Sequence, residues 1–301
     1  MNLTNVVFDP ETQAGDPLSL GEHEYVYDDR RVVMAVRIAL ITDRPLLITG
    51  SPGSGKSSLA ADVARRLRRA YVETVVTSRT RLSDLVAEVD QVRRLNDAQA
   101  QLLQHRQDSD YLVPGMLWWA FDPDSARRAP LAAAERLVRP ENQRRGVVVL
   151  LDEIDKAEPD LPNDLLGPLA NAGIDVPFHG NKKPGAPTLV IITSNGEREM
   201  PSAFLRRCLH LELDEPRVPF LERVAKAHYG PRSDDLYTDV ARRLVELQDD
   251  AVRWARRPPS TAEFLDAVNA CIRLDQRPSS GMWDAIEEAA LRKARPPRHR
   301  A

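Results

Sequence analysis

Residues 46–57 read LLITGSPGSGKS, a short apolar run followed by a glycine-rich loop. The loop fits the pattern G-x-x-x-x-G-K-[ST]. Glycines let the backbone wrap so that successive N–H groups point at phosphate oxygens, and a following helix adds its positive N-terminal dipole. Leu59, Val63 and Leu67 share one face of a helix expected over 57–69. The stretch therefore predicts a strand, a phosphate-binding loop and a helix in succession.

The loop residues have separate expected roles. Lys56 is expected to reach the β- and γ-phosphates of a nucleoside triphosphate, and the Ser57 hydroxyl is expected to ligate Mg²⁺. The candidate phosphate-binding residues are Gly50, Ser51, Pro52, Gly53, Ser54, Gly55, Lys56, Ser57 and Ser58. A glycine-rich turn without a ligand is the alternative, and the flanking strand and helix argue against it.

A second apolar run, VVVLL over 147–151, ends in Asp152 and Glu153. Two carboxylates at the end of a buried strand resist desolvation unless they face a cation or water. Asp152 is expected to hold Mg²⁺ through its water shell, and Glu153 to polarise an attacking water. Surface charge would explain an isolated acidic pair, but this pair follows a phosphate loop.

Two further features leave alternatives open. The strand over 189–193 runs into Asn195, which either orients water near the γ-phosphate or serves the turn expected from its Asn-Gly dipeptide. Arg206 and Arg207 are either solvated on a surface helix or supply an arginine finger in trans to a neighbouring site.

Continuous apolar strands between helices indicate an α/β fold with a parallel sheet covered on both faces. A strand over 71–77 and helices over 30–43 and from Leu82 to Val92 are also expected. After Asp214 the pattern is helical, with helices expected over 221–229, 236–254, 260–274 and 282–295. Ser260 with Glu263 fits a capping box. We expect an extension over 1–22, an α/β core over 23–214, a smaller helical domain over 215–295 and a basic tail over 296–301.

Composition narrows the class of protein. The 301 residues include 42% hydrophobic and 29% charged residues, with a formal net charge of -3. This acidic balance argues against a nucleic-acid binder. Two cysteines without metal-ligand spacing, no long apolar segment and no signal peptide indicate a cytoplasmic protein with no membrane insertion and no metal beyond Mg²⁺.

Together these features resemble the AAA+ ATPases, and specifically the MoxR-like group. The resemblance covers roughly residues 20–275 and rests on GSPGSGKSS, LLDEIDKAEPDLPNDLLGPLA, TSNGEREMPSAFLRRC and RPPSTAEFLDAV. It implies ATP and Mg²⁺ as cofactors, a Walker B pair at Asp152 and Glu153, sensor 1 at Asn195, and an arginine finger at Arg207 rather than Arg206. It also implies a five-stranded sheet of order 5-1-4-3-2, with 208–213 as the last strand, and a helical lid after Asp214.

The same resemblance implies a mechanoenzyme that hydrolyses ATP in a ring, usually a homo-hexamer. Such a ring remodels or activates a client or adaptor protein, often one with a von Willebrand factor A domain. The alternative is a nucleotide-dependent scaffold or switch with little turnover, because the sensor 2 arginine is missing from the helix start at 260–263. Arg256 or Arg257 is a possible substitute.

The segment 78–146 is long for a connection between two strands. It contains YLVPGMLWWAF over 111–121, the densest aromatic cluster of the chain. One hypothesis is an insert that lines a pore or contacts a partner, and the other is an apolar patch that packs on the core or on a neighbouring subunit.

Overall fold

The computed structural model describes residues 8–13, 15–16, 24–131, 136–169, 173–232, 234–254, 257–278 and 280–292. The chain divides into two compact units. Unit 1 comprises Met1–Pro17, Asp29–Thr49 and Lys56–Glu212, and unit 2 comprises Leu18–Asp28, Gly50–Gly55 and Leu213–Ala301. The predicted basic tail over 296–301 and most of the predicted extension over 1–22 lie outside the described residues.

Unit 1 is built on a five-stranded parallel sheet with the order β2-β5-β8-β1-β9. Its strands are β1 (Leu46–Thr49), β2 (Ala70–Val75), β5 (Val147–Asp152), β8 (Thr188–Ser194) and β9 (Leu209–Glu212). Counted among themselves in chain order, they run 5-1-4-3-2 from β9 to β2, the order that the resemblance implies. In detail the chain differs from that expectation, because two further two-stranded sheets are present: β3 (Ala87–Val89) with β4 (Leu112–Pro114), and β6 (Ile174–Val176) with β7 (Gly180–Lys182).

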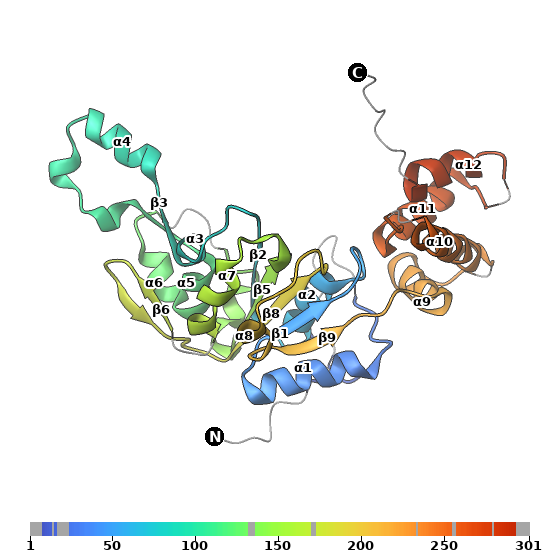
Figure 1. Cartoon of the computed structure of the whole chain (residues 1–301), viewed down its shortest axis with the longest axis horizontal. Coiled ribbons are helices and arrows are strands. Elements are labelled where there is room, and N and C mark those ends of the chain that lie inside the picture. Colours follow the sequence, from blue (N-terminus) through green and yellow to red (C-terminus); the bar gives the residue numbers. More distant parts are fainter. Residues whose placement is uncertain are drawn as a thin grey trace. The chain divides into compact units, whose positions relative to one another are not determined.

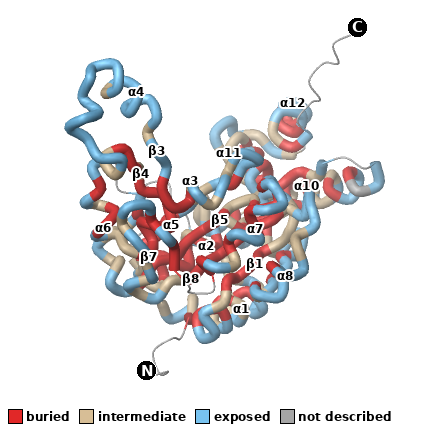
Figure 2. Tube along the Cα trace, turned by 60° about the vertical axis from the view of Figure 1, so that its left-hand side comes forward, coloured by how far each residue is buried: buried red, intermediate tan, exposed pale blue. Residues whose placement is uncertain are grey.

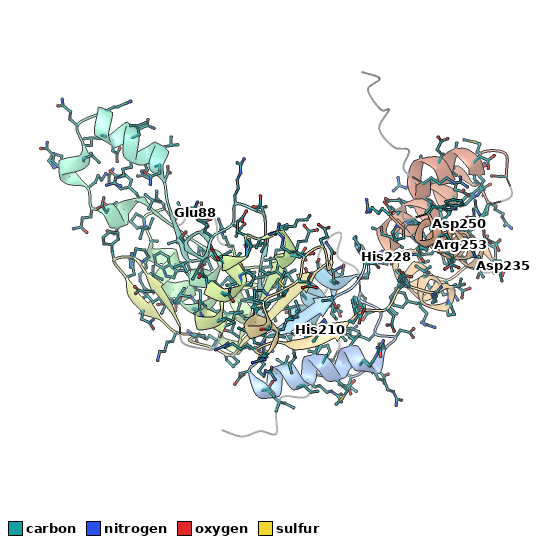
Figure 3. The ribbon with its side chains drawn as sticks, in the orientation of Figure 1. Glu88, His210, His228, Asp235, Asp250 and Arg253 are labelled. Atoms are coloured by element: carbon teal, nitrogen blue, oxygen red, sulfur yellow. The ribbon has the colours of Figure 1, made fainter. Side chains whose placement is uncertain are left out.

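The sheet is buried because helices cover it (Figure 1). Residues 147–151 of β5 and 189–194 of β8 are all buried, as a parallel sheet covered on both faces requires. The remaining helical elements of unit 1 are α1 (Arg30–Thr42), α2 (Lys56–Arg66), α6 (Pro123–Arg128), η4 (Pro140–Arg145), η5 (Ile154–Lys156), α7 (Asp160–Asp164) and α8 (Ser202–Leu205), beside those described below. His210 of β9, labelled in Figure 3, hydrogen bonds to the Thr49 hydroxyl at the end of β1 (2.9 Å).

The aromatic segment belongs to the core of unit 1. All six residues of α5 (Met116–Phe121) are buried, and Trp118 is 0% exposed. The indole N–H of Trp118 donates to the Ser125 hydroxyl at 3.3 Å. The hypothesis that these tryptophans line a pore or contact a partner is therefore wrong, and the alternative of packing on the core is confirmed.

The single helix expected from Leu82 to Val92 is also wrong. The chain instead forms α3 (Leu82–Val86), β3 (Ala87–Val89) and α4 (Gln91–Gln99). The helix ends because β3 pairs with β4 (Leu112–Pro114) in an antiparallel ladder, and Asp90 then caps α4 by accepting the Arg93 N–H at 2.9 Å.

Residues 90–110 form an arm that projects from the rest of unit 1, and Figures 1 and 2 show α4 at its exposed end. No residue of α4 or of η2 (Leu103–His105) is buried. Val92 is 72% and Leu95 is 58% exposed, and Leu102 and Leu103 are also exposed. The turn η3 (Asp108–Tyr111) returns the chain to β4, with Tyr111 buried at the base of the arm.

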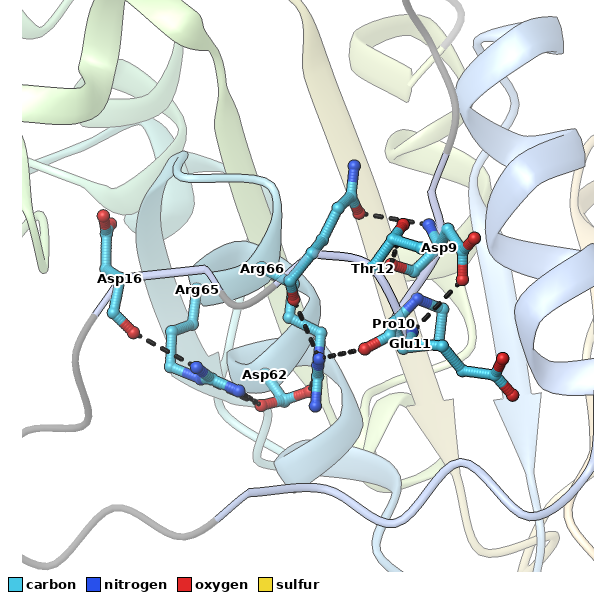
Figure 4. A network of polar contacts seen from close by, with 9 residues as sticks. Asp9, Pro10, Glu11, Thr12, Asp16, Asp62, Arg65 and Arg66 are labelled. Atoms are coloured by element: carbon cyan, nitrogen blue, oxygen red, sulfur yellow. Dashed lines mark hydrogen bonds and ion pairs between the residues drawn. The ribbon is translucent and has the colours of Figure 1, made fainter.

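The N-terminal segment is fastened to α2 by a buried charge network (Figure 4). Asp62 accepts hydrogen bonds from Arg65 Nη2 (2.6 Å) and Arg66 Nε (2.7 Å), and all three residues are buried. Arg65 Nη1 also donates to the Asp16 carbonyl at 3.1 Å, and Arg66 Nη1 donates to the Gln13 carbonyl at 2.9 Å. The network therefore joins the helix after the phosphate loop to Gln13 and Asp16.

Unit 2 is helical after Leu213. It contains α9 (Val218–Tyr229), α10 (Leu236–Arg253), α11 (Thr261–Leu274), α12 (Trp283–Ile286) and the π-helical turn η7 (Glu287–Arg292). Leu221, Leu244, Phe264 and Trp283 contribute to its own apolar core. The predicted capping box is confirmed, since Ser260 and Glu263 cap each other's backbone N–H. None of the described helices of the chain is both long and apolar enough to span a bilayer.

The remaining short strands form a hairpin in unit 1. β6 (Ile174–Val176) pairs with β7 (Gly180–Lys182) in antiparallel register. Lys182 forms an ion pair with Asp122 at 3.1 Å, which ties the hairpin to the turn between α5 and α6. Phe178 at the turn of the hairpin is 70% exposed.

Candidate active site

The glycine-rich loop follows β1 and leads into α2. Gly53 and Gly55 have φ values of 76° and 92°, the left-handed region that glycine adopts without steric cost. A Cβ at Gly53 would lie 2.3 Å from the Ser260 Cβ, so no larger residue fits there. The Ser54 hydroxyl is buried and has no hydrogen-bond partner among the described residues. Such a glycine cradle with an orphaned hydroxyl fits an anionic ligand with acceptor oxygens.

Ser57 and Asp152 lie together although 95 residues separate them. The Ser57 hydroxyl is 2.9 Å from each carboxylate oxygen of Asp152, and the Thr193 hydroxyl also donates to Asp152 Oδ1. A hydroxyl beside a carboxylate suits Mg²⁺, which keeps several waters and binds substrate phosphates with few protein ligands. The described residues contain no cluster of three or more Asp, Glu, His or Cys that could hold a metal alone.

Lys56 at the start of α2 is only 6% exposed. Burial lowers the pKa of its ammonium group, while the charges of Asp152, Asp155 and Glu153 oppose that shift. Because desolvation disfavours the charged amine, a bound phosphate would stabilise the cation. Lys56 therefore lies at a position where a bound anion would favour its charged form.

Glu153 follows β5 in a strained backbone conformation with φ of 60°, a region that costs a non-glycine residue about 1–3 kcal/mol. Its N–H donates to the Thr193 hydroxyl at 2.9 Å. One carboxylate oxygen pairs with Lys156 Nζ at 2.6 Å, and the other accepts from Asn195 Nδ2 at 3.4 Å. Lys156 has a raised pKa because it donates this hydrogen bond to Glu153. The structure thus brings the predicted residues Glu153 and Asn195 together.

Three residues of this site were absent from the sequence prediction: Thr193, Asp155 and Lys156. Thr193 is completely buried, and its hydroxyl joins the acidic pair of β5 to β8. Asp155 is 2% exposed and accepts the backbone N–H groups of Asn195 and Glu197, each at 3.0 Å. Two sequence signals could have indicated these residues. Thr193 is a hydroxyl residue at the end of the strand over 189–193, and an acid and a base, Asp155 and Lys156, follow two and three positions after Glu153.

The predicted finger residues lie elsewhere in unit 1. Arg206 and Arg207 follow α8 and are exposed, and within the described part of the chain neither forms a hydrogen bond or ion pair with Lys56, Asp152 or Glu153. The guanidinium of Arg44 donates to the carbonyls of Arg206 (2.6 Å), Arg207 (3.2 Å) and Cys208 (3.0 Å). This brace orders the backbone that carries both arginines.

The structure describes one of the two candidate substitutes for a sensor 2 arginine. Arg256 lies outside the described residues. Arg257 has a side chain that is 63% exposed and pairs with Glu263 of the capping box at 3.7 Å. This pairing places Arg257 at the N-terminal end of α11 in unit 2.

A parallel sheet with a glycine-rich loop after one inner strand, and an acidic pair at the end of a nearby strand, defines a nucleotide-binding protein of the phosphate-loop class. The model of the family described as AAA domain (dynein-related subfamily) matches residues 45–208, more than half of the 301 residues. The chain therefore belongs to this family and is an AAA+ protein. The match begins at β1 and ends before β9, so the helices of unit 2 lie outside it.

One solved structure supports the fold, and a second can be compared in sequence identity and coverage. The Thermotoga maritima RuvB P216G mutant is similar over 91% of this chain and 73% of its own, with a TM-score of 0.50 and 15% identity. A second RuvB structure from that organism, described as a Holliday junction branch migration motor, is similar over 86% of this chain and 67% of its own, with a TM-score of 0.46 and 17% identity. No curated protein sequence matches the chain.

Proposed function

We propose that this protein is a Mg²⁺-dependent AAA+ ATPase of the MoxR-like type, which uses ATP hydrolysis to remodel or activate a partner protein. The observation that carries the proposal is the meeting of Asp152 with Ser57, and of Glu153 with Asn195, beside the buried Lys56. These contacts bring together, at one end of the sheet, the side chains that we propose for phosphate binding, metal binding and water activation.

Each side chain has a role in the proposed reaction. The loop N–H groups and Lys56 would bind the phosphates of ATP, and Ser57 with Asp152 would hold the Mg²⁺ ion, which neutralises phosphate charge when bound. Glu153 would accept a proton from the attacking water, and Asn195 would hold that water or the γ-phosphate. Arg207, or less favourably Arg206, would act in trans on a neighbouring subunit.

Assembly and partner are further parts of the proposal. Sites completed by Arg207 of a neighbouring subunit require a ring of identical subunits, for which a hexamer is the expected size. The helices after Asp214 would act as the lid. The arm over 90–110 supports a partner interaction, because Val92, Leu95, Leu102 and Leu103 are exposed on it. A client or adaptor with a von Willebrand factor A domain is the partner that the MoxR-like resemblance favours.

A second candidate function is a nucleotide-dependent switch with little turnover. The observation that favours it is the 2.6 Å contact between Glu153 and Lys156. The ammonium group of Lys156 occupies one oxygen of the carboxylate that would accept a proton from the attacking water. Hydrolysis then requires the Glu153 carboxylate to separate from the Lys156 ammonium group. In a nucleotide-dependent switch this separation would be rare, and turnover would be low.

The test is steady-state ATP hydrolysis over a range of protein concentrations, with Mg²⁺ and with EDTA. We compare the wild type, Glu153→Gln, and Glu158→Gln as a matched control at a nearby exposed glutamate. A rate per subunit that rises with concentration, needs Mg²⁺ and is lost only in Glu153→Gln supports the ATPase. Tight ATP binding with the same negligible rate in all three proteins supports the switch, and no nucleotide binding refutes both.

A further inference from the structure

We propose that Asp155 is a positioning residue for hydrolysis, which fixes the backbone of 195–197 so that Asn195 reaches Glu153. This inference rests on the proposed ATPase function and concerns the same site. It predicts that Asp155 is needed for turnover much more than for nucleotide binding.

Burial of the Asp155 carboxylate has an unfavourable desolvation free energy. It is 2% exposed, and its Oδ1 is buried without a hydrogen-bond partner among the described residues. An ionised carboxylate loses several kcal/mol on burial unless hydrogen bonds or cations offset the loss. A carboxylate at 155 therefore requires partners that offset its desolvation.

The second step is what the carboxylate holds. Asp155 Oδ2 accepts the N–H groups of both Asn195 and Glu197, each at 3.0 Å. The intervening N–H, that of Gly196, donates to the Ser194 hydroxyl at 3.0 Å. Three successive N–H groups are thus directed by side chains rather than by a strand or helix. Because Gly196 has a φ of 75°, the turn has a flexible residue at its centre, and Asp155 spans it.

The third step links this turn to the reacting groups. Asn195 Nδ2 lies 3.4 Å from Glu153 Oε1, at the long end of the hydrogen-bond range. A small displacement of the Asn195 backbone would break this contact. Misplacement of a positioning group by about 1 Å can lower the rate about 100-fold. In this inference Asp155 acts through the position of Asn195, whose N–H group it accepts.

Charge is the competing explanation, because Asp155 is one of three acids that raise the pKa of Lys56 against its desolvation. The variant Asp155→Asn separates the two effects. Its amide oxygen can accept both N–H groups, but it carries no charge. If hydrogen bonding to the turn is the role of Asp155, Asp155→Asn retains much of the turnover that Asp155→Ala loses. If charge is the role, both variants lose turnover equally.

The experiment measures kcat for ATP and Kd for a fluorescent ATP analogue in the wild type, Asp155→Asn, Asp155→Ala, Asn195→Ala and the double variant Asp155→Ala/Asn195→Ala. Asp164→Ala, at an exposed acid that ends α7, is the matched control. We expect kcat to fall at least about 10-fold in Asp155→Ala, with Kd changed less than about 3-fold. We expect the double variant to be no slower than Asn195→Ala, because the effects of residues that act as a unit are not additive. Deuterium exchange at the amides of 195 and 197 should accelerate in Asp155→Ala but not in the control.

The outcomes separate the inference from the proposed function. A wild type without ATPase activity refutes the proposed function, and the inference falls with it. An active wild type in which the two losses of kcat multiply, or in which Asp155→Asn is as slow as Asp155→Ala, overturns the inference alone. If Asp155→Ala fails to fold, Asp155→Asn with and without Asn195→Ala carries the same additivity test.

Discussion

Removal of the Asp62 carboxylate is the sharpest test of the structure of unit 1. Asp62 is 4% exposed and accepts hydrogen bonds from Arg65 Nε (3.0 Å), Arg65 Nη2 (2.6 Å) and Arg66 Nε (2.7 Å). Figure 4 shows the two guanidinium groups converging on this acid. In Asp62→Ala both guanidinium groups lose their hydrogen bonds to this carboxylate, at arginine side chains that are only 6% exposed in the native structure.

The magnitude follows from that burial. Breaking a buried ion pair by removal of one partner costs roughly 3–5 kcal/mol, because an uncompensated charge remains inside the protein. For a unit of about 150–250 residues this corresponds to a fall in Tm of about 6–20 °C. The segment 10–16 should also loosen, because its carbonyl oxygens at residues 13 and 16 accept from the same arginines.

The assay is urea denaturation followed by circular dichroism, together with deuterium exchange of the N-terminal segment. Asp124→Ala is the matched control, since Asp124 pairs with Arg127 at 2.9 Å with the same i,i+3 spacing as Asp62 and Arg65, but its side chain is 68% exposed. Exposed pairs contribute about 0–1 kcal/mol. A loss below about 1 kcal/mol in Asp62→Ala, or one equal to that of the control, would refute the reasoning.

Two further predictions concern the core of each unit. Trp118→Ala should lower the unfolding free energy of unit 1 by roughly 3–5 kcal/mol, because it empties a completely buried site. Trp254→Ala, at a site that is 70% exposed, should change the unfolding free energy little. Equal losses of unfolding free energy in the two variants would contradict the buried position of α5. In unit 2, hydrogen bonds from Arg243 and then Arg292 lower the pKa of Glu287 from 4.5 to about 2. Because the pKa of Glu287 is lower in the folded state, the stabilisation that Glu287 contributes is present above pH 4.5 and is lost as the pH falls towards 2. Glu287→Gln should therefore flatten this part of the acid-denaturation curve. An unchanged curve would argue against the hydrogen bonds of Glu287 with Arg243 and Arg292.

The local features of this protein could be predicted from the sequence. The glycine loop, the acidic pair after β5 and the capping box at Ser260 each depend on residues that lie within a few positions of one another. The apolar runs placed strands at β1, β2, β5 and β8, because buried parallel strands require continuous apolar residues. Family resemblance, not periodicity, supplied the order of the strands.

The failures have a common physical cause. The helix expected from Leu82 to Val92 ends at Val86 because β3 pairs with β4, about 25 residues further along the chain. Trp118 and Trp119 are buried in the core of unit 1, whereas the sequence left open a pore-lining or partner-contacting insert as the second hypothesis. Periodicity records which residues are apolar, but not which surface covers them.

The sequence by itself determined the phosphate loop, the acids beside it and the start of the helix at Ser260, because backbone conformation and chemistry there follow from adjacent residues. Only the tertiary structure decided that the Thr193 hydroxyl bonds to Asp152 and to the Glu153 N–H, and that Asp155 holds the turn of Asn195. These contacts depend on the register of β5 against β8, in which Leu151 faces Ile192. A shift of that register by one residue would turn each side chain to the other face of the sheet and dissolve the site.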